Sequence, residues 1–129
     1  MKNCDPRTVS TAALAYLGDA VIELCVRTRL MELGYTSSKA LNAHARDYVA
    51  APMQAAAMER LHPLLTEEEA AVFRRGRNIG HTNTPKRATV AEYRSATGME
   101  TLFGYLYMTG KQERIDALFA AAYPQEENV

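Results

Sequence analysis

Apolar residues recur along the chain at the three- to four-residue spacing of amphipathic helices, and no segment alternates as a β-strand does. The first helical segment begins at Ser10 or Thr11, either of which can cap a helix, and runs to about Leu33, where Gly34 ends it. Its apolar positions at helical spacing are Leu14, Leu17, Val21, Leu24 and Leu30. The pattern predicts one long N-terminal helix whose apolar side faces a core.

Capping and breaking residues divide the rest of the chain into further helices. Pro52 is expected in the first turn of one of them, because it cannot donate a backbone hydrogen bond, and Thr66 forms a capping box with Glu69 at the start of another. The later helices are predicted over about 38–47, 52–62, 66–77, 89–108 and 112–122. A loop at 79–87, rich in breakers, interrupts them. The fold class is therefore all-α.

Length and composition fit a single domain over residues 1–129, with a core at about 10–122 and a flexible C-terminal tail. The chain is 47% hydrophobic and has no apolar run that could span a bilayer, nor an apolar export signal near Met1. Its two cysteines, Cys4 and Cys25, suggest no disulfide framework. We expect a cytoplasmic protein without a membrane partner.

Positive charge is concentrated in one part of a chain whose formal net charge is zero. The cations between residues 71 and 94 are Arg74, Arg75, Arg77, Lys86, Arg87 and Arg94, against Glu92 alone, which gives 6 − 1 = +5. Arginine forks suit phosphate oxygens, and Asn78 can donate to phosphate or 2′-hydroxyl groups. The other interpretation is a solvated helix end whose cations complement the helix dipole. The cations of the loop favour phosphate or RNA contact by Arg74, Arg75, Arg77, Asn78, Lys86 and Arg87.

Two acids lie four residues apart within the first helix. Asp19 follows Gly18, a residue that is unfavourable inside a helix, and Glu23 shares a helix face with Asp19. Acids in an apolar helix need partners, and a divalent cation is one such partner. The alternative is an ordinary amphipathic helix in which Glu23 pairs with Arg27, and spacing alone leaves both open.

A second apolar helix carries an acid in the same manner. Glu100 and Gly104 are four residues apart and share a face. We hypothesise that Gly18 and Gly104 let two helix backbones approach closely, which would bring Asp19 near Glu100 in a site for Mg²⁺. The alternative is that the glycines serve packing alone and that Glu100 pairs with an arginine. Zinc-ligand spacing, phosphate-binding glycine loops and nucleophile motifs are not found in the sequence.

Together these segments resemble the catalytic domain of the ribonuclease III family, and in particular its Mini-ribonuclease III group. Tyr16–Leu24 is similar to the signature helix of the family, and Met99–Tyr107 to its second acidic motif. Arg75–Asn78, Thr84–Lys86 and Tyr93–Arg94 are similar to blocks of the Mini group. The resemblance extends over nearly the whole chain and implies the helical endonuclease fold without a double-stranded-RNA-binding domain.

The resemblance implies that Asp19 and Glu100 are the catalytic, metal-binding acids. Full-length members have two further carboxylates at the positions of Ala15 and Thr97, so one Mg²⁺ is expected here rather than two. Glu23 is expected to support the structure only.

The function that the resemblance implies is Mg²⁺-dependent cleavage of double-stranded RNA by a homodimer, leaving 5′-phosphate and 3′-hydroxyl ends. The implied substrate is the precursor of 23S ribosomal RNA, and a ribosomal protein is a further candidate partner. Two alternatives stay open. One is a non-catalytic RNA-binding factor for ribosome assembly that kept the fold, and the other is a helical Mg²⁺-dependent nucleotide hydrolase.

Overall fold

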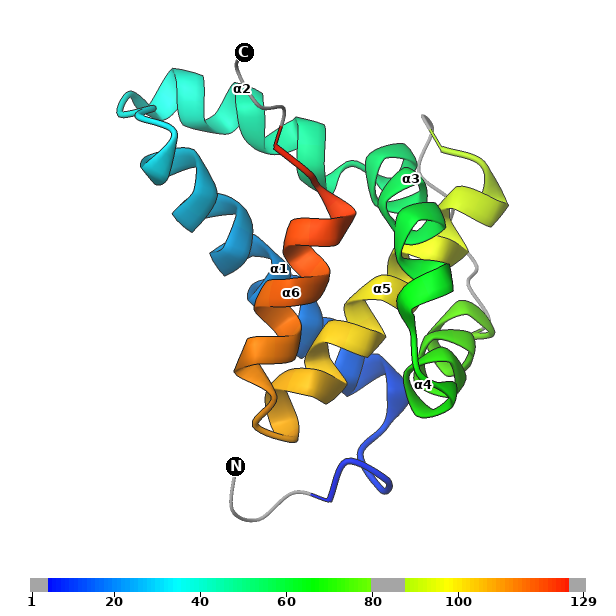
Figure 1. The fold of residues 1–129 in the computed structure, drawn as a ribbon. Helices are drawn as coiled ribbons and strands as arrows, with labels where there is room; N and C mark the ends of the chain where they lie inside the picture. Colours follow the sequence, from blue (N-terminus) through cyan, green and yellow to red (C-terminus); the bar gives the residue numbers. More distant parts are fainter. Residues whose placement is uncertain (1–4, 80–87, 126–129) are drawn as a thin grey trace.

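The computed structural model describes residues 5–79 and 88–125, and the described part is helical, with no strand (Figure 1). Its elements are α1 (Thr11–Glu32), α2 (Ser38–Val49), α3 (Ala51–Leu61), the 3₁₀ turn η1 (His62–Leu64), α4 (Glu67–Arg77), α5 (Val90–Met108) and α6 (Gln112–Ala122). The predicted all-α class is confirmed. The predicted loop from Gly80 to Arg87 and the last four residues of the predicted tail lie outside the described residues.

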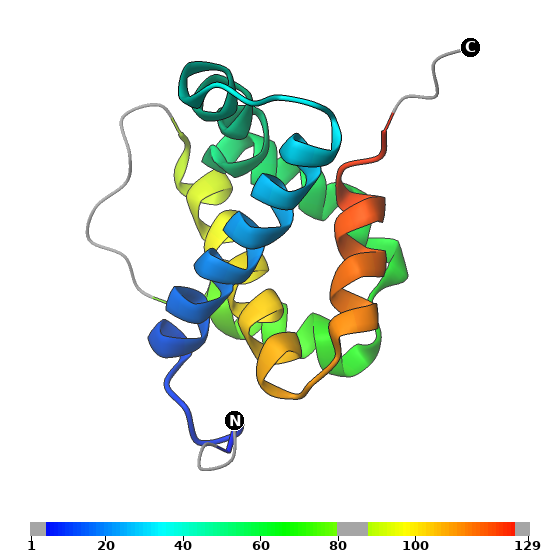
Figure 2. The same ribbon diagram turned by 90° about the vertical axis from the view of Figure 1, so that its left-hand side faces the viewer.

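Helix α5 lies in the middle of the bundle and contacts α1, α3 and α4 along its length (Figures 1 and 2). Four of its apolar side chains, Met99, Leu102, Phe103 and Leu106, are fully buried. Burial of such side chains stabilises a fold by about 1.5–3 kcal/mol each, so α5 is a main source of the stability of the core. None of the helices within the described residues is long and apolar enough to cross a membrane.

The helices begin at the caps that the sequence predicts. The Ser10 hydroxyl accepts a hydrogen bond from the Ala13 amide at 3.1 Å, which places the start of α1 at Thr11. Thr66 and Glu69 form both hydrogen bonds of the predicted capping box, and Pro52 lies in the first turn of α3. These contacts satisfy backbone groups that helix ends leave without partners.

One core prediction is wrong. Leu24 was expected on the buried side of α1, but its side chain is 67% exposed. The buried side includes Ile22 and Val26. Leu24 is two positions from each of them, which places it about 200° around the helix axis from both. Leu24 therefore points to solvent, together with Met31.

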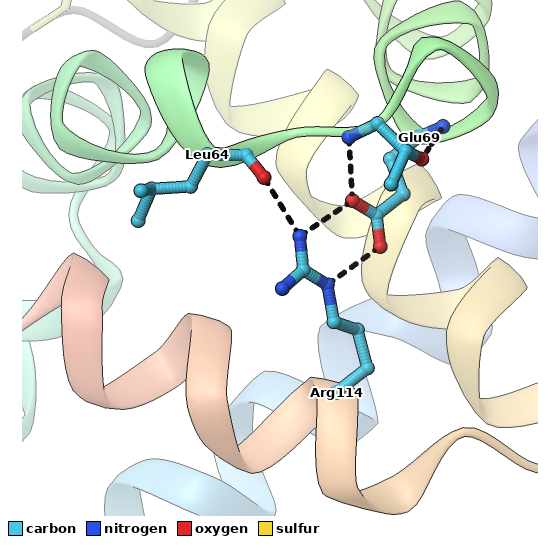
Figure 3. A network of polar contacts seen from close by, with 4 residues as sticks. Leu64, Glu69 and Arg114 are labelled. Carbon is cyan, nitrogen blue, oxygen red and sulfur yellow. Dashed lines mark hydrogen bonds and ion pairs between the residues drawn. The ribbon is translucent and has the colours of Figure 1, made fainter.

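A charged pair joins α4 to α6 at the edge of the core (Figure 3). The Arg114 guanidinium donates to both carboxylate oxygens of the buried Glu69, each at 2.8 Å, and to the Leu64 carbonyl oxygen. Glu69 also accepts from the Thr66 amide at 2.9 Å. The hydrogen bonds from Arg114 lower the pKa of Glu69 below its ordinary value, against the effect of burial.

Replacing Arg114 by alanine is expected to destabilise the protein by about 2–3 kcal/mol, because it leaves the buried Glu69 carboxylate without its cation. Urea denaturation at neutral pH measures the loss. The lowered pKa of Glu69 means that the pair stabilises the fold above the ordinary pKa of 4.5 and stops doing so as the pH falls through the lower folded value. A loss that is the same at neutral pH and in acid would contradict this account.

Candidate active site

The crossing of α1 and α5 is a contact between two backbones. A Cβ atom added to Gly18 would lie 1.6 Å from the Glu100 carbonyl oxygen, and one added to Gly104 would lie 2.0 Å from the Leu14 carbonyl oxygen. Only glycine fits at either position, since these distances are far below van der Waals contact. The hypothesis that Gly18 and Gly104 let two helices approach closely is confirmed.

This crossing brings the two predicted acids together. Asp19 lies one residue after Gly18 and is exposed, while Glu100 is partly buried beside it. The pKa of Glu100 is raised to about 8, first because burial penalises the charged form and then because Asp19 is close and hydrogen-bonded to it. The two acids therefore act as a coupled pair rather than as separate surface carboxylates.

Asp19 and Glu100 both line an open groove of about 370 Å³. The described residues that line it are Ala12, Ala15, Tyr16, Asp19, Ile79, Tyr93, Thr97 and Glu100. No arginine is among them, and the neighbour of Glu100 is Asp19 rather than a cation. Of the alternatives left open for Glu100, the structure therefore supports the acid pair over the ion pair with arginine.

The two carboxylates fit a single hard cation. Mg²⁺ prefers oxygen ligands, keeps several of its waters and is often held by one or two carboxylates. Burial and the nearby Asp19 raise the pKa of Glu100 and so disfavour full ionisation of the pair near neutral pH, and a bound cation would offset this effect. No cluster of three or more potential ligands among His, Cys, Asp and Glu occurs within residues 5–79 and 88–125. Ala15 and Thr97, where full-length members have acids, line the same groove.

Glu23 lies outside this groove. Its carboxylate accepts from Arg27 Nε at 2.9 Å, one helical turn further along α1. The ion pair that the spacing allowed for Glu23 is confirmed, and the carboxylate makes no described contact with Asp19 or Glu100.

The structure separates the predicted RNA-binding residues into three groups. Arg74, Arg77 and Asn78 are exposed at the end of α4, where Arg77 donates to the Asn78 side chain at 3.3 Å. Arg75 is partly buried and turned toward α1. Lys86 and Arg87 lie outside the described residues. RNA contact by these residues stays a prediction.

The groove residues that were not singled out as site residues from the sequence are Ala12, Tyr16, Ile79 and Tyr93. Ile79 reaches the groove because it follows directly on the basic end of α4. Tyr93 lies four and seven residues before Thr97 and Glu100, and this spacing places all three on one face of α5. That spacing is a signal through which Tyr93 could have been found.

The raised pKa of Glu100 predicts how the stability of the metal-free protein depends on pH. Between the ordinary value of 4.5 and the folded value of about 8, the unfolded chain has released a proton that folded Glu100 still holds. Rising pH therefore favours unfolding across this window and has no further effect through Glu100 above it. We expect the Tm in EDTA to fall from about pH 5 to 8, and to fall less in the Glu100→Gln variant. Parallel Tm curves for the two proteins would contradict this prediction.

Fold and site together define a helical domain with a pair of acids in an open groove, and comparison with known proteins identifies its family. The model of the Ribonuclease III domain matches residues 12–111, so the chain belongs to the ribonuclease III domain family. Membership in this family makes the chain an endoribonuclease by class.

Individual relatives are similar over nearly their full length. "Mini-ribonuclease 3" of Symbiobacterium thermophilum is 48% identical over 95% of this chain and 94% of that protein. "Mini-ribonuclease 3" of Brevibacillus brevis is 41% identical over 92% of this chain and 89% of that protein. An X-ray crystal structure of a protein from Fusobacterium nucleatum has a TM-score of 0.85 at 29% identity and covers 95% of this chain and 100% of that one. The resemblance to the Mini group is confirmed.

Proposed function

We propose that this protein is a Mg²⁺-dependent endoribonuclease that cleaves double-stranded RNA and matures the ends of the 23S ribosomal RNA precursor in the cytoplasm. The observation that carries the proposal is the close pair of Asp19 and Glu100 in an open groove, on the two helices where the ribonuclease III signature motifs lie. The similarity to proteins named Mini-ribonuclease 3 supports the ribonuclease activity, and the choice of substrate follows from the resemblance to the Mini group.

In the proposed reaction the two acids have different tasks. Asp19 and Glu100 would hold one Mg²⁺, which, when bound, neutralises charge on the phosphate and lowers the pKa of a water. Glu100 is partly buried, and its backbone contacts Gly18 at the crossing of α1 and α5. In the proposed reaction it is therefore the more rigidly placed of the two carboxylates. Exposed Asp19 faces the open groove, where its carboxylate orients the attacking water for cleavage that leaves 5′-phosphate and 3′-hydroxyl ends.

The test is a cleavage assay on a perfect RNA duplex, with and without Mg²⁺. We expect 5′-phosphate products in Mg²⁺ and none in EDTA. The absence of the groove carboxylates at Ala15 and Thr97 favours a second candidate, a non-catalytic RNA-binding factor for ribosome assembly. Tight binding of the duplex without cleavage in either condition would support that second function.

Arg74 and Arg77, at the exposed C-terminal end of α4, are the proposed RNA-binding residues. A-form RNA is recognised largely through its shape and backbone, so cations aimed at phosphates are the expected contacts. Replacing Arg74 and Arg77 together by alanine should weaken duplex binding and reduce the slope of log K against log salt concentration by about 2, since roughly one counterion is released per phosphate contact. Filter binding at several salt concentrations measures the slope, with Arg46→Ala on α2 as the control. An unchanged slope would place the RNA elsewhere.

A second copy of this chain is the proposed partner of the exposed apolar face of α1. Leu24 and Met31 are 67% and 70% exposed on α1, and Tyr107 of α5 is 47% exposed. Leu24 and Tyr107 line one groove along α1 and α6. Apolar side chains gathered in this way mark protein interfaces, and a homodimer fits the family.

Replacing Leu24 by aspartate should convert the dimer to a monomer, because it places a charge in the proposed apolar interface. Sedimentation analysis measures the mass. The control is Val90→Asp, which changes an apolar side chain that is 52% exposed at the start of α5 and does not line the groove of Leu24 and Tyr107. A dimer of wild-type affinity in the Leu24 variant would exclude this face.

A further inference from the structure

Arg75 lies on α4 between the exposed Arg74 and the buried Gly76, and its guanidinium is directed to the start of α1. Its Nε donates to Thr11 Oγ1 at 2.8 Å, and a terminal nitrogen donates to the Val9 carbonyl oxygen at 2.5 Å. These two acceptors lie on either side of Ser10, the N-cap of α1. One side chain thus joins the C-terminal end of α4 to the first residues of the helix that carries Asp19.

Three segments form the walls of the acid groove, and two of their three junctions are close contacts at a glycine. Helix α1 is fixed on α5 at Gly18. Helix α4 is fixed on α5 at Gly76, where an added Cβ would lie 2.2 Å from Thr101 Oγ1. The third junction joins the α1 wall to the wall that Ile79 forms just after α4. Among the polar contacts described for residues 5–79, those of Arg75 bridge this junction.

We propose that Arg75 is a positioning residue, which fixes the opening of the groove by holding its α1 and α4 walls together, and that it does not contact RNA. The guanidinium offers several N–H donors in a rigid fork, and two of them reach acceptors two residues apart. The ammonium group of a lysine is a single donor centre and does not span both acceptors. Arg74 and Arg77, which are exposed, remain the proposed phosphate contacts on this helix. The catalytic consequence rests on the proposed function, whereas the structural tie does not.

The proposal is tested with Arg75→Ala and Arg75→Lys beside Arg77→Ala and the surface control Arg46→Ala. Both Arg75 variants should lower kcat on duplex RNA by about ten- to a hundredfold, because small displacements of a site have such effects, while KM and the salt slope of binding stay at wild-type values. Hydrogen exchange of the amides in the first turns of α1 should become at least about tenfold faster in both variants. Arg77→Ala should instead raise KM and reduce the salt slope, with wild-type exchange in α1.

Three results would overturn the proposal. Wild-type kcat in Arg75→Lys would show that charge alone suffices. A raised KM and a reduced salt slope in Arg75→Ala would show that Arg75 contacts RNA. A lower Tm with unchanged kcat and unchanged exchange in α1 would show a merely structural role. If the wild-type protein does not cleave duplexes, the proposed function fails, and the exchange of α1 amides still decides whether Arg75 ties the two walls together.

Discussion

Replacing Asp19 by asparagine is expected to lower the rate of duplex cleavage by about a thousandfold or more while the protein stays folded and dimeric. The substitution keeps the size of the side chain but removes the charge that would hold Mg²⁺ and orient the water. Loss of such charge stabilisation costs several kcal/mol in the transition state, and each 1.36 kcal/mol corresponds to about tenfold in rate. Because Asp19 is exposed, the core does not depend on its carboxylate.

The matched control for Asp19→Asn is Glu23→Gln, which removes a carboxylate one turn further along the same helix. Glu23 pairs with Arg27 and does not line the groove, so its variant should cleave at close to the wild-type rate. Single-turnover cleavage with saturating Mg²⁺ separates the two. Full activity in Asp19→Asn would remove the basis of the proposed site.

Replacing Gly18 by alanine is expected to have the largest effect on stability. The new Cβ would lie 1.6 Å from the Glu100 carbonyl oxygen and 2.8 Å from the Gly104 nitrogen, and both are backbone atoms that no rotamer change can move away. The helices must separate, which opens the core along the whole crossing. Overpacking typically costs 1–3 kcal/mol, and a backbone clash at this distance should exceed about 4 kcal/mol, much of the 5–15 kcal/mol that stabilises a domain.

The control for Gly18→Ala is Gly34→Ala, after α1. A Cβ added there meets no atom within 4 Å, so the variant bears only the strain of a φ of +95°. That strain amounts to about 1–2 kcal/mol. Thermal denaturation of both variants measures the difference in stability. A Gly18 variant as stable as the Gly34 variant would show that α1 and α5 can separate with little loss of stability.

Local signals in the sequence predicted much of the fold. The starts of α1 and α4 depend on hydrogen bonds between residues three positions apart, those of Ser10 and of the Thr66–Glu69 box. These boundaries can therefore be predicted without tertiary information. Leu24 was misplaced because its spacing from Leu17 and Val21 is helical, whereas the buried side of α1 turns toward Ile22 and Val26. The Arg75 contacts join positions more than sixty residues apart, and no local pattern encodes them.

The candidate site was predictable to the extent that glycines mark it. Gly18 and Gly104 are costly in helix interiors, and that cost indicated a close helix contact, from which the pairing of Asp19 with Glu100 followed. The raised pKa of Glu100 was not predictable, because it depends on how deeply the crossing buries that carboxyl. The roles of the two acids in catalysis remain predictions.

The crossing at Gly18 and Gly104 also bears on how this enzyme can change over evolutionary time. Because main-chain atoms set the separation of α1 and α5, drift in the outer side chains leaves the spacing of the acids unaltered. The wall formed by Ile79 lies outside both helices, just after α4, and can diverge independently. Laboratory selection for new RNA substrates should therefore accumulate substitutions at the ends of α4 and α5 and almost none at the two glycines.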